Sequence, residues 1–390
     1  MSSTGKTQRG LKVSSRSEIA PFYVMEVMRQ AEAQEASGGD VLHLEVGQPS
    51  TPAPVLAREA AKRAIDEDLL GYTSAAGMAP LRNRLSAHYL DWYDQEVDPD
   101  HIVLTMGASG GFILSFLACF DPGDRVVVAS PGYPPYRNIL TTLGIEVVDL
   151  PVGPESRFQP TPTMLDALGP IDGLVVASPA NPTGTMLLPA ELDELIRWCS
   201  SKGVRLISDE IYHGISYGDR AVTAATWDQA VVVNSFSKYF SMTGWRLGWL
   251  IVPPEMRRSI EHLAQNAMIA APAVSQHAAL AALDAHEELQ ANVVRYRENR
   301  TILLEGLTRL GIDRLAPANG AFYIYANVDH LTDDSTELAR LWLEELGIAT
   351  TPGVDFDPAR GHKFIRFSFA GATQDMRRTI DRLQAWLKST

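Results

Sequence analysis

A lysine and an aspartate each end an apolar string in the middle of the chain. Lys238 follows Val-Val-Val-Asn-Ser-Phe-Ser, and a partly desolvated strand end disfavours its ammonium form and frees the amine to attack a carbonyl. Asp209 ends the apolar run 204–208, where an unpaired carboxylate is costly. The pair suits a pyridine ring carrying an aldehyde, since the carboxylate keeps the ring nitrogen protonated while the amine holds the aldehyde carbon. A snorkelling lysine and a structural ion pair or helix cap are the alternatives.

A second set of residues has the chemistry of an anion site. The turn 107–111, Gly-Ala-Ser-Gly-Gly, leads into a helical pattern, where glycines let backbone N–H groups approach an oxyanion. Its spacing is not G-x-G-x-x-G, which disfavours a dinucleotide fold. Ser235, Ser237 and Arg246 add two hydroxyls and a guanidinium close to Lys238. Together these groups predict a phosphate monoester site, whereas the glycines alone are equally compatible with an unliganded turn.

The elements that must position these residues form a βα alternation. Short runs of β-branched residues alternate with turns and amphipathic stretches, and the predicted strands are 101–105, 125–129, 174–177, 204–208, 231–234 and 247–252. Continuous apolar runs are typical of a parallel sheet covered by helices on both faces, which makes the core an α/β fold. Ligands bind beyond the carboxyl ends of such strands, and the polar motifs follow five of them.

The two ends of the chain have a different pattern. Residues 320–326 and 363–369 alternate like half-buried strands, and a long helical pattern over 274–310 would connect them to the core. We therefore predict a large domain over 51–285 and a smaller α+β domain formed by 17–50 together with 286–390.

Composition excludes several classes of function. The 390 residues carry 34 basic and 47 acidic side chains, so a formal charge of −13 argues against nucleic acid as a partner. No apolar stretch reaches the roughly 18 residues that span a bilayer, so we expect no membrane segment. Cys119 and Cys199 lie in helical patterns and suit free thiols in the cytoplasm. We expect no metal site.

The first 16 residues are basic and rich in Ser and Thr. This composition mimics an organellar transit peptide, but only Leu11 and Val13 could form its apolar face. We therefore predict a disordered tail over 1–16.

Four motifs in a fixed order carry a family resemblance. They are Asn181-Pro-Thr-Gly184, Asp209-Glu-Ile-Tyr212, Ser235-Phe-Ser-Lys238 and Arg246, within a span from Gly47 to Arg366. In this order and spacing the chain resembles the class I/II aminotransferases of pyridoxal-phosphate fold type I. The resemblance implies a large domain with a mostly parallel, seven-stranded sheet. It also implies transfer of an amino group from an amino acid to a 2-oxo acid in a ping-pong cycle, with pyridoxal 5'-phosphate as cofactor.

The resemblance also implies a role for each matching residue. Lys238 would be the Schiff-base lysine and proton carrier, Asp209 would bind the pyridinium nitrogen, and Asn181 and Tyr212 would hydrogen-bond the ring hydroxyl, with Lys238, Asp209 and Tyr212 as the catalytic residues. Tyr133 would stack on the ring. The phosphate would be held by Ala108, Ser109, Ser235, Ser237 and Arg246, and the substrate carboxylate by Arg366, Gly47 and Asn181. Tyr72 matches a tyrosine that reaches the neighbouring subunit's phosphate, which implies a homodimer with shared active sites.

Each role has an ordinary structural alternative. Asn181-Pro182 is also a good turn pair, Tyr133 could be a loop aromatic, Arg366 could form a cross-strand salt bridge, and Tyr72 could cap a helix. At the level of function, a C–S β-lyase starts from the same constellation, and a regulatory protein could keep the fold. The latter would need a DNA-binding domain, for which the first 40 residues are too short.

Two further expectations concern geometry and specificity. By the resemblance, the Ser130–Pro131 and Asn181–Pro182 peptide bonds should be cis. Enzymes of the family that prefer dicarboxylates use an arginine from the partner subunit, but the segment 265–275 has no cation. Because a buried carboxylate without a partner is costly, we expect neutral amino donors.

Overall fold

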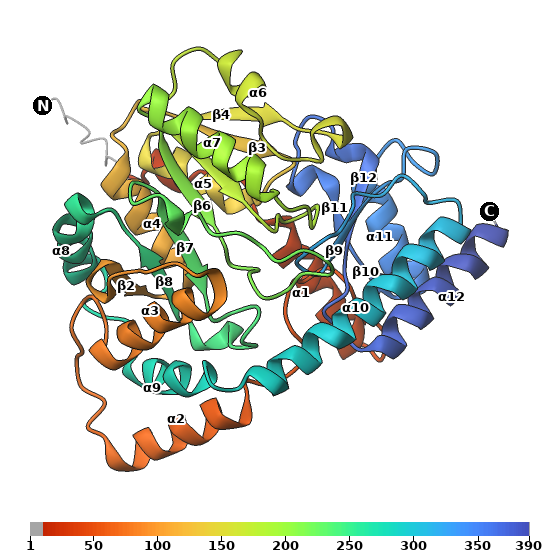
Figure 1. Ribbon diagram of the computed structural model, residues 1–390. Coiled ribbons are helices and arrows are strands. Elements are labelled where there is room, and N and C mark those ends of the chain that lie inside the picture. Colours follow the sequence, from red (N-terminus) through yellow and green to blue (C-terminus); the bar gives the residue numbers. More distant parts are fainter. Residues whose placement is uncertain (1–10, 390) are drawn as a thin grey trace, which may run out of the picture.

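A seven-stranded sheet lies at the centre of the molecule, as the computed structural model of residues 11–389 shows (Figure 1). Its strand order is β2-β8-β7-β6-β5-β3-β4. The strands are β2 (Ile102–Thr105), β3 (Arg125–Ser130), β4 (Glu146–Pro151), β5 (Gly173–Ala177), β6 (Arg205–Asp209), β7 (Val231–Ser235) and β8 (Gly248–Ile251). All adjacent pairs are parallel except those of β8, which is antiparallel to β2 and β7. The predicted α/β class and mostly parallel sheet are confirmed.

Helices cover both faces of this sheet because alternate strand residues point to opposite sides. Val126, Val175 and Ile207 pack with α4 (Gly107–Cys119), α5 (Pro134–Leu143) and α8 (Arg257–Ala267). Val127, Leu174 and Leu206 belong to the core of the other face, with α3 (Ala79–Tyr93), α7 (Pro189–Lys202) and α9 (Ala273–Ala282). Two further helices complete the layers, α2 (Val55–Glu67), which packs on α9, and the short α6 (Pro162–Asp166). Burial on both faces explains why the strands read as continuous apolar runs.

Strand β4 was not among the predicted strands. It lies at the edge of the sheet, pairs only with β3, and is partly exposed along most of its length. Its sequence contains Glu146, Asp149 and Pro151, which an edge strand tolerates and a central strand does not. The continuous apolar pattern used to find the other strands is therefore missing here.

The single helix predicted over 274–310 was wrong, because the structure has two helices there. Helix α9 ends at Ala282 and α10 spans His286–Arg309. At the break, Arg84 of α3 donates to the carbonyl of Leu283 (3.1 Å) and to Asp284 (3.1 Å). These bonds satisfy groups at the helix end and let the chain change direction before α10 begins.

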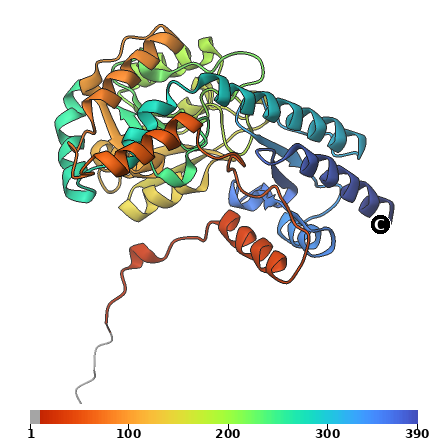
Figure 2. The same ribbon diagram turned by 90° about the horizontal axis from the view of Figure 1, so that it is seen from below.

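The two chain ends meet in a smaller region of mixed structure (Figure 2). Strand β1 (Leu42–His43) pairs with β10 (Ile348–Ala349), and β12 (Phe364–Ser368) lies between β11 (Thr351–Pro352) and β9 (Tyr323–Asn327) in an antiparallel sheet. Helices α1 (Tyr23–Ala36), α11 (Ser335–Leu346) and α12 (Thr373–Ser389) surround them. The two predicted strands of this region are confirmed, whereas the division into 17–50 with 286–390 and 51–285 remains a prediction.

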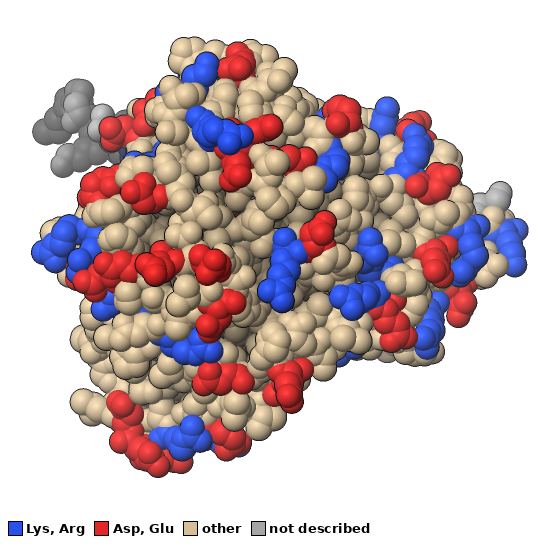
Figure 3. All heavy atoms as spheres, viewed as in Figure 1, with Lys and Arg blue, Asp and Glu red and all other residues tan. Residues whose placement is uncertain are grey.

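The predicted tail over 1–16 lies mostly outside the described residues, which begin at Leu11; Ser15–Ser17 form one 3-10 turn. Among residues 11–389, none of the helices has the length and hydropathy to cross a membrane. On the face shown in Figure 3, basic and acidic side chains are interspersed over the small region and the sheet helices alike.

Candidate active site

A cavity of about 520 Å³ opens at the carboxyl end of the central sheet, between the sheet, α1 and the small region. Eleven of the predicted site residues line it: Gly47, Ala108, Ser109, Tyr133, Asn181, Asp209, Tyr212, Ser237, Lys238, Arg246 and Arg366. They come from at least six separate segments of the chain. The sheet brings these segments together because its parallel strands all end at this edge.

Lys238 projects into the cavity from the turn after β7. Its Nζ donates to the carbonyl of Gly47 at 2.6 Å and lies 5.9 Å from the centre of the Tyr212 ring. Burial lowers the pKa of Lys238 to about 8, and the positive charges of Arg366 and Arg246 act in the same direction. A substantial fraction of the amine is therefore neutral near pH 8 and can act as a nucleophile.

Asp209 ends β6 and lies opposite this lysine, 4% exposed. Its carboxylate accepts a hydrogen bond from the Tyr136 hydroxyl through Oδ2 and one from the backbone N–H of Ile211 (3.0 Å) through Oδ1. Burial raises the pKa of Asp209 to about 6, while Tyr136 and Ile211 oppose that rise. The two hydrogen-bond donors and the charge of Lys238 favour the ionised form of this buried carboxyl group, which can accept a hydrogen bond from a protonated ligand nitrogen.

Residues of the predicted anion site lie together at the start of α4. Gly107 has φ +68, and a Cβ at this position would lie 2.6 Å from Nη2 of Arg246, so the guanidinium lies directly against the glycine turn. The first backbone N–H groups of α4 have no partner within the helix. Arg246 also donates from Nη1 to the carbonyl of Thr243 (3.0 Å), and this bond holds the guanidinium in place. The exposed Ser109 and the buried Ser237 lie at the same end of the cavity. The cluster can hold a phosphate.

Ser235 does not line the cavity. It is buried at the end of β7, and its hydroxyl donates to the Ser237 hydroxyl (2.9 Å) or to the carbonyl of Leu247 (3.1 Å). Its Oγ also accepts from the backbone N–H of Ser237 (3.1 Å). Ser235 is the last residue of β7 and Ser237 belongs to the turn that follows, so these bonds make Ser235 a support for Ser237.

Arg366 lies on β12, 1% exposed, beside Asn181. It donates to Asn181 Oδ1 (2.8 Å), to the Thr351 hydroxyl (3.1 Å) and to the carbonyl of Glu45. No carboxylate lies within ion-pair distance of Arg366 in the part of the chain that the structure describes, so the cross-strand salt bridge is wrong. A buried guanidinium held only by neutral groups favours an incoming carboxylate.

Gly47 is required by the close approach of the Tyr323 side chain. A Cβ at this position would lie 1.6 Å from the Tyr323 hydroxyl oxygen. That hydroxyl is 2.8 Å from the Tyr212 hydroxyl, and Arg366 stacks over the Tyr323 ring at 4.4 Å. Gly47, Tyr323, Tyr212 and Arg366 therefore form one packed corner of the cavity.

Tyr72 is 86% exposed and does not line this chain's cavity. It follows Leu69, which is 94% exposed, on the segment between α2 and α3. A helix-cap role is wrong, since Tyr72 belongs to neither helix and α3 begins seven residues later.

The structure adds cavity residues that the motifs did not indicate. Tyr136, Tyr323 and Thr243 line it, as does an apolar wall formed by Phe22, Val24, Met25, Met28 and Ile211. The Phe22 ring meets the Tyr133 ring edge-on at 6.0 Å, so α1 reaches across the mouth of the cavity. Tyr136 was detectable in principle, because it follows Tyr133 by three residues on a helical pattern that starts at a strand end.

The expected cis peptide bonds Ser130–Pro131 and Asn181–Pro182 are both confirmed, and Ser178–Pro179 is cis as well. They lie at the ends of β3 and β5, next to Tyr133 and Asn181.

Comparisons with known proteins agree with this geometry. The family model for aminotransferase class I and II matches residues 39–383. The valine–pyruvate aminotransferase of Mycobacterium tuberculosis (strain ATCC 25618 / H37Rv) is 50% identical over 384 residues, which cover 97% of this chain and 99% of that protein. A crystal structure of an aminotransferase from Mycobacterium tuberculosis superposes with a TM-score of 0.96 at 50% identity, covering 98% of this chain and 100% of the other. Aspartate aminotransferase from Thermus thermophilus with maleate gives 0.91 at 30% identity, covering 97% and 100%.

The chain belongs to the class I and II aminotransferase family. It is an enzyme, an aminotransferase, and the C–S β-lyase alternative is not favoured.

Proposed function

We propose that this aminotransferase uses pyridoxal 5'-phosphate to move the amino group of a neutral, apolar amino acid to a 2-oxo acid in a ping-pong cycle. We also propose that it acts as a homodimer in the cytoplasm, a location that the two free thiols of Cys119 and Cys199 support. The observation that carries the substrate proposal is the lining of the cavity, which combines an apolar wall with two arginines. In this proposal Arg246 binds the cofactor phosphate and Arg366 binds the substrate α-carboxylate, so neither is left for a second carboxylate.

The residues present fit the cofactor. The glycine turn at Gly107 leaves room for an anion beside Arg246, and a carboxyl at Asp209 suits a protonated ring nitrogen. Arg366 donates to Asn181 Oδ1, which leaves the amide nitrogen of Asn181 able to donate a hydrogen bond to a ligand. The Tyr212 hydroxyl can also donate one. When bound, pyridoxal phosphate supplies an aldehyde that takes up the amino group and a ring that accepts the electron pair released at the substrate Cα.

The chain's own residues do the remaining work. Lys238 Nζ takes the proton from the substrate Cα and delivers it again, for which a pKa of about 8 is well matched. Arg366 binds the α-carboxylate that the amino acid and the 2-oxo acid share. Asp209 holds a proton on the ring nitrogen, and Tyr133 and α1 exclude water from one side of the cavity.

The cavity surface that remains for the side chain of the amino donor is apolar. Lys238, Arg246 and Arg366 are the cations that line the cavity within residues 11–389, and each has a role already. Val24, Met25 and Met28 of α1 then meet the donor's side chain, and a methionine-rich wall adapts to several apolar shapes. The name of the valine–pyruvate relative, at 50% identity, supports valine as a donor and pyruvate as an acceptor.

Donor preference is the first test. With pyruvate as a fixed acceptor, we expect kcat/KM for valine to exceed that for aspartate by at least about tenfold, because a second carboxylate would be buried without a partner. The panel should contain valine, alanine, methionine, aspartate and glutamate. A preference for aspartate above about tenfold, or roughly 1.4 kcal/mol in transition-state binding, would overturn the substrate proposal.

The lowered pKa of Lys238 predicts how cofactor loading depends on pH. Only the neutral amine reacts, and its fraction falls about tenfold for each pH unit below the pKa. Since burial lowers that pKa to about 8, we expect the rate of loading onto apoenzyme to rise steeply from pH 6.5 to 7.5 and to level off above pH 8.5. Stopped-flow absorbance measures it, with Lys238→Ala as the control that should show no such rise. A plateau beginning only above pH 10 would contradict the lowered pKa.

Several exposed apolar residues support the homodimer. Leu69, Tyr72, Met106, Leu117 and Ile269 are each more than 40% exposed. A second cavity of about 650 Å³, lined by Met106, Thr243 and Arg246, lies beside the proposed phosphate site. A tyrosine from a second copy could enter the site from that side.

Mixed dimers test the shared site. Tyr72→Ala and Lys238→Ala subunits refolded together should regain activity that neither has alone, because one of the two sites in a hybrid combines an intact Lys238 with the partner's intact tyrosine. Hybrid dimers that are verified by mass and stay inactive would show that Tyr72 does not serve the neighbouring site.

A further inference from the structure

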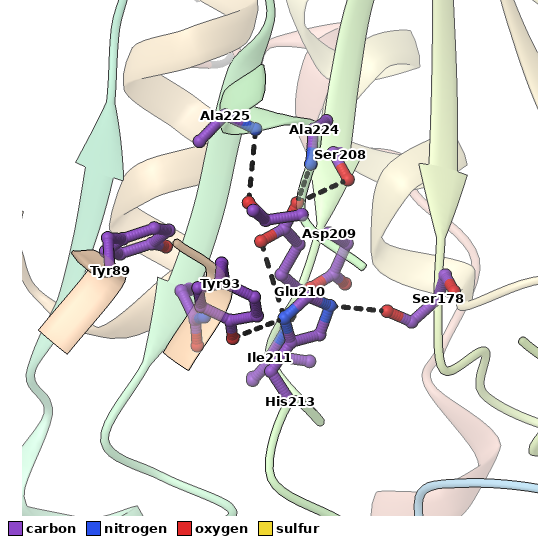
Figure 4. Close-up of polar contacts among 12 residues, drawn as sticks. Tyr89, Tyr93, Ser178, Ser208, Asp209, Glu210, Ile211, His213, Ala224 and Ala225 are labelled. Carbon is purple, nitrogen blue, oxygen red and sulfur yellow. Dashed lines mark hydrogen bonds and ion pairs between the residues drawn. The ribbon is translucent and has the colours of Figure 1, made fainter. Parts of the chain in front are cut away.

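A largely buried polar cluster lies next to Asp209 and Ile211 of the candidate active site (Figure 4). It consists of His213, Tyr93, Glu210 and the carbonyl of Ser178, and we call it the His213 cluster. None of its members lines the 520 Å³ cavity. Two of them nevertheless flank cavity residues in the sequence, since Glu210 follows Asp209 and His213 follows Tyr212.

The contacts of His213 fix its tautomer. Its Nε2 lies 2.9 Å from the carbonyl oxygen of Ser178, which can only accept, so Nε2 carries the hydrogen. Its Nδ1 lies 2.7 Å from the Tyr93 hydroxyl. Burial lowers the pKa of His213 to about 4, so the ring is neutral at pH 7 and Nδ1 accepts from Tyr93. Both ring nitrogens therefore have partners, and the ring has one orientation.

Glu210 closes the third side of the ring. The side chain is fully buried, and its Oε1 accepts from the backbone N–H of Ala224 (2.7 Å) and the hydroxyl of Ser208 (3.1 Å). Its Oε2 has no hydrogen bond and lies 3.5 Å from His213 Nδ1. Burial raises the pKa of Glu210 to about 7. A buried carboxyl group so anchored leaves His213 little room to turn away from Ser178.

The bond from His213 to Ser178 joins two segments of the active site. Ser178 opens the loop that carries Asn181, and its backbone N–H also bonds to the carbonyl of Asp209 (3.2 Å). His213 follows Tyr212 in the same turn, where its own N–H bonds to the carbonyl of Glu210 (2.9 Å). The side chain thus spans between the Asn181 loop and the Tyr212 turn from outside the cavity.

We propose that His213 is a positioning residue whose Nε2–H bond to Ser178 sets the separation of Asn181 and Tyr212. This inference rests on the proposed function, in which these two side chains hydrogen-bond the cofactor's ring hydroxyl. Their joint spacing then governs how tightly the cofactor binds and the pH at which the visible absorption of the holoenzyme changes, because both donors favour the ionised ring oxygen.

Two amide variants separate this role from simple packing. In His213→Gln the side-chain nitrogen reaches the position of the histidine Nε2 and can still donate to Ser178, whereas in His213→Asn it reaches only the position of Nδ1. Both variants are polar and smaller than histidine, and because Asn is one methylene shorter than Gln, the pH midpoint is read together with the Kd. Tyr93→Phe removes the hydroxyl that orients the ring and is the third variant.

The measurements are the Kd of apoenzyme for pyridoxal phosphate, by fluorescence, and the pH midpoint of the holoenzyme's visible absorption. We expect His213→Asn to weaken binding by about tenfold and to raise the midpoint by about one pH unit, His213→Gln to stay within about threefold of the unaltered enzyme, and Tyr93→Phe to fall between. Equal values for the Gln and Asn variants, or a normal midpoint in both, would overturn the inference.

Other outcomes remain decisive. If His213→Asn does not fold, Tyr93→Phe must still move the midpoint upward, and a normal midpoint in that variant would overturn the inference. If the unaltered protein shows no cofactor binding at all, the proposed function fails first; if it binds normally and only the variant pattern is absent, the function stands and the role of His213 does not.

Discussion

Replacing Lys238 by alanine is expected to leave a folded protein whose kcat is lower by about 10⁴-fold or more, because the change removes both the nucleophilic amine and the group that carries the Cα proton. Steady-state transamination between valine and pyruvate measures it. The fold should tolerate the change, since Nζ makes one hydrogen bond to the protein, to Gly47, and its loss costs about 1 kcal/mol.

Two controls sharpen this prediction. Lys238→Arg keeps the positive charge but cannot form the covalent bond, so it should be as inactive as the alanine variant. A thermal melt confirms that each variant folds. If Lys238→Ala retained more than about a tenth of the activity, the amine would lie outside the chemistry and the site would have to be reassigned.

Replacing Arg366 by leucine is expected to lower kcat/KM by about 10³-fold for the amino acid and for the 2-oxo acid alike, because both lose a charge-assisted, bidentate partner in a buried setting. Arg366→Lys should recover little, since an ammonium cannot reproduce the fork that meets a carboxylate. Separate half-reactions with valine and with pyruvate measure the two losses.

The matched control for Arg366 is an amine without a carboxylate. Isobutylamine has the side chain of valine but no carboxylate, so its slow half-reaction should change little in Arg366→Leu. The ratio of valine to isobutylamine reactivity should therefore collapse in the variant. An unchanged ratio, with both substrates slowed equally, would mean that the variant damages the site in general and that Arg366 does not bind the α-carboxylate.

The sequence predicts most of the cavity residues because, in a parallel sheet, the position of a residue relative to the end of its strand determines where that residue lies. A polar residue at or just beyond the carboxyl end of a buried parallel strand must lie at one edge of the sheet, as Asp209 does at the end of β6 and Lys238 in the turn after β7. Arg366 and Asn181 were found through their motifs, and the two segments meet in space although 185 positions separate them.

What the sequence could not show depends on contacts between distant segments. Ser235 and Ser237 look equivalent in the motif, yet β7 ends at Ser235, and only Ser237, in the turn that follows, lines the cavity. The part of the apolar wall that α1 supplies and the hydrogen bond from Tyr136 to Asp209 require the helices to be placed first. Strand β4 was missed because it lies at the exposed edge of the sheet and lacks a continuous apolar run. The break before α10 was missed because a contact with Arg84 of α3, rather than local propensity, accompanies it.

Borohydride reduction of the holoenzyme followed by peptide mapping tests the central claim most directly. The reagent fixes the cofactor to the amine that holds it, which converts a reversible bond into a mass label on one residue. The account predicts a single phosphopyridoxyl label on Lys238, in the peptide that also contains Ser237. A label on a different lysine, or a reduced protein without any label, would contradict it.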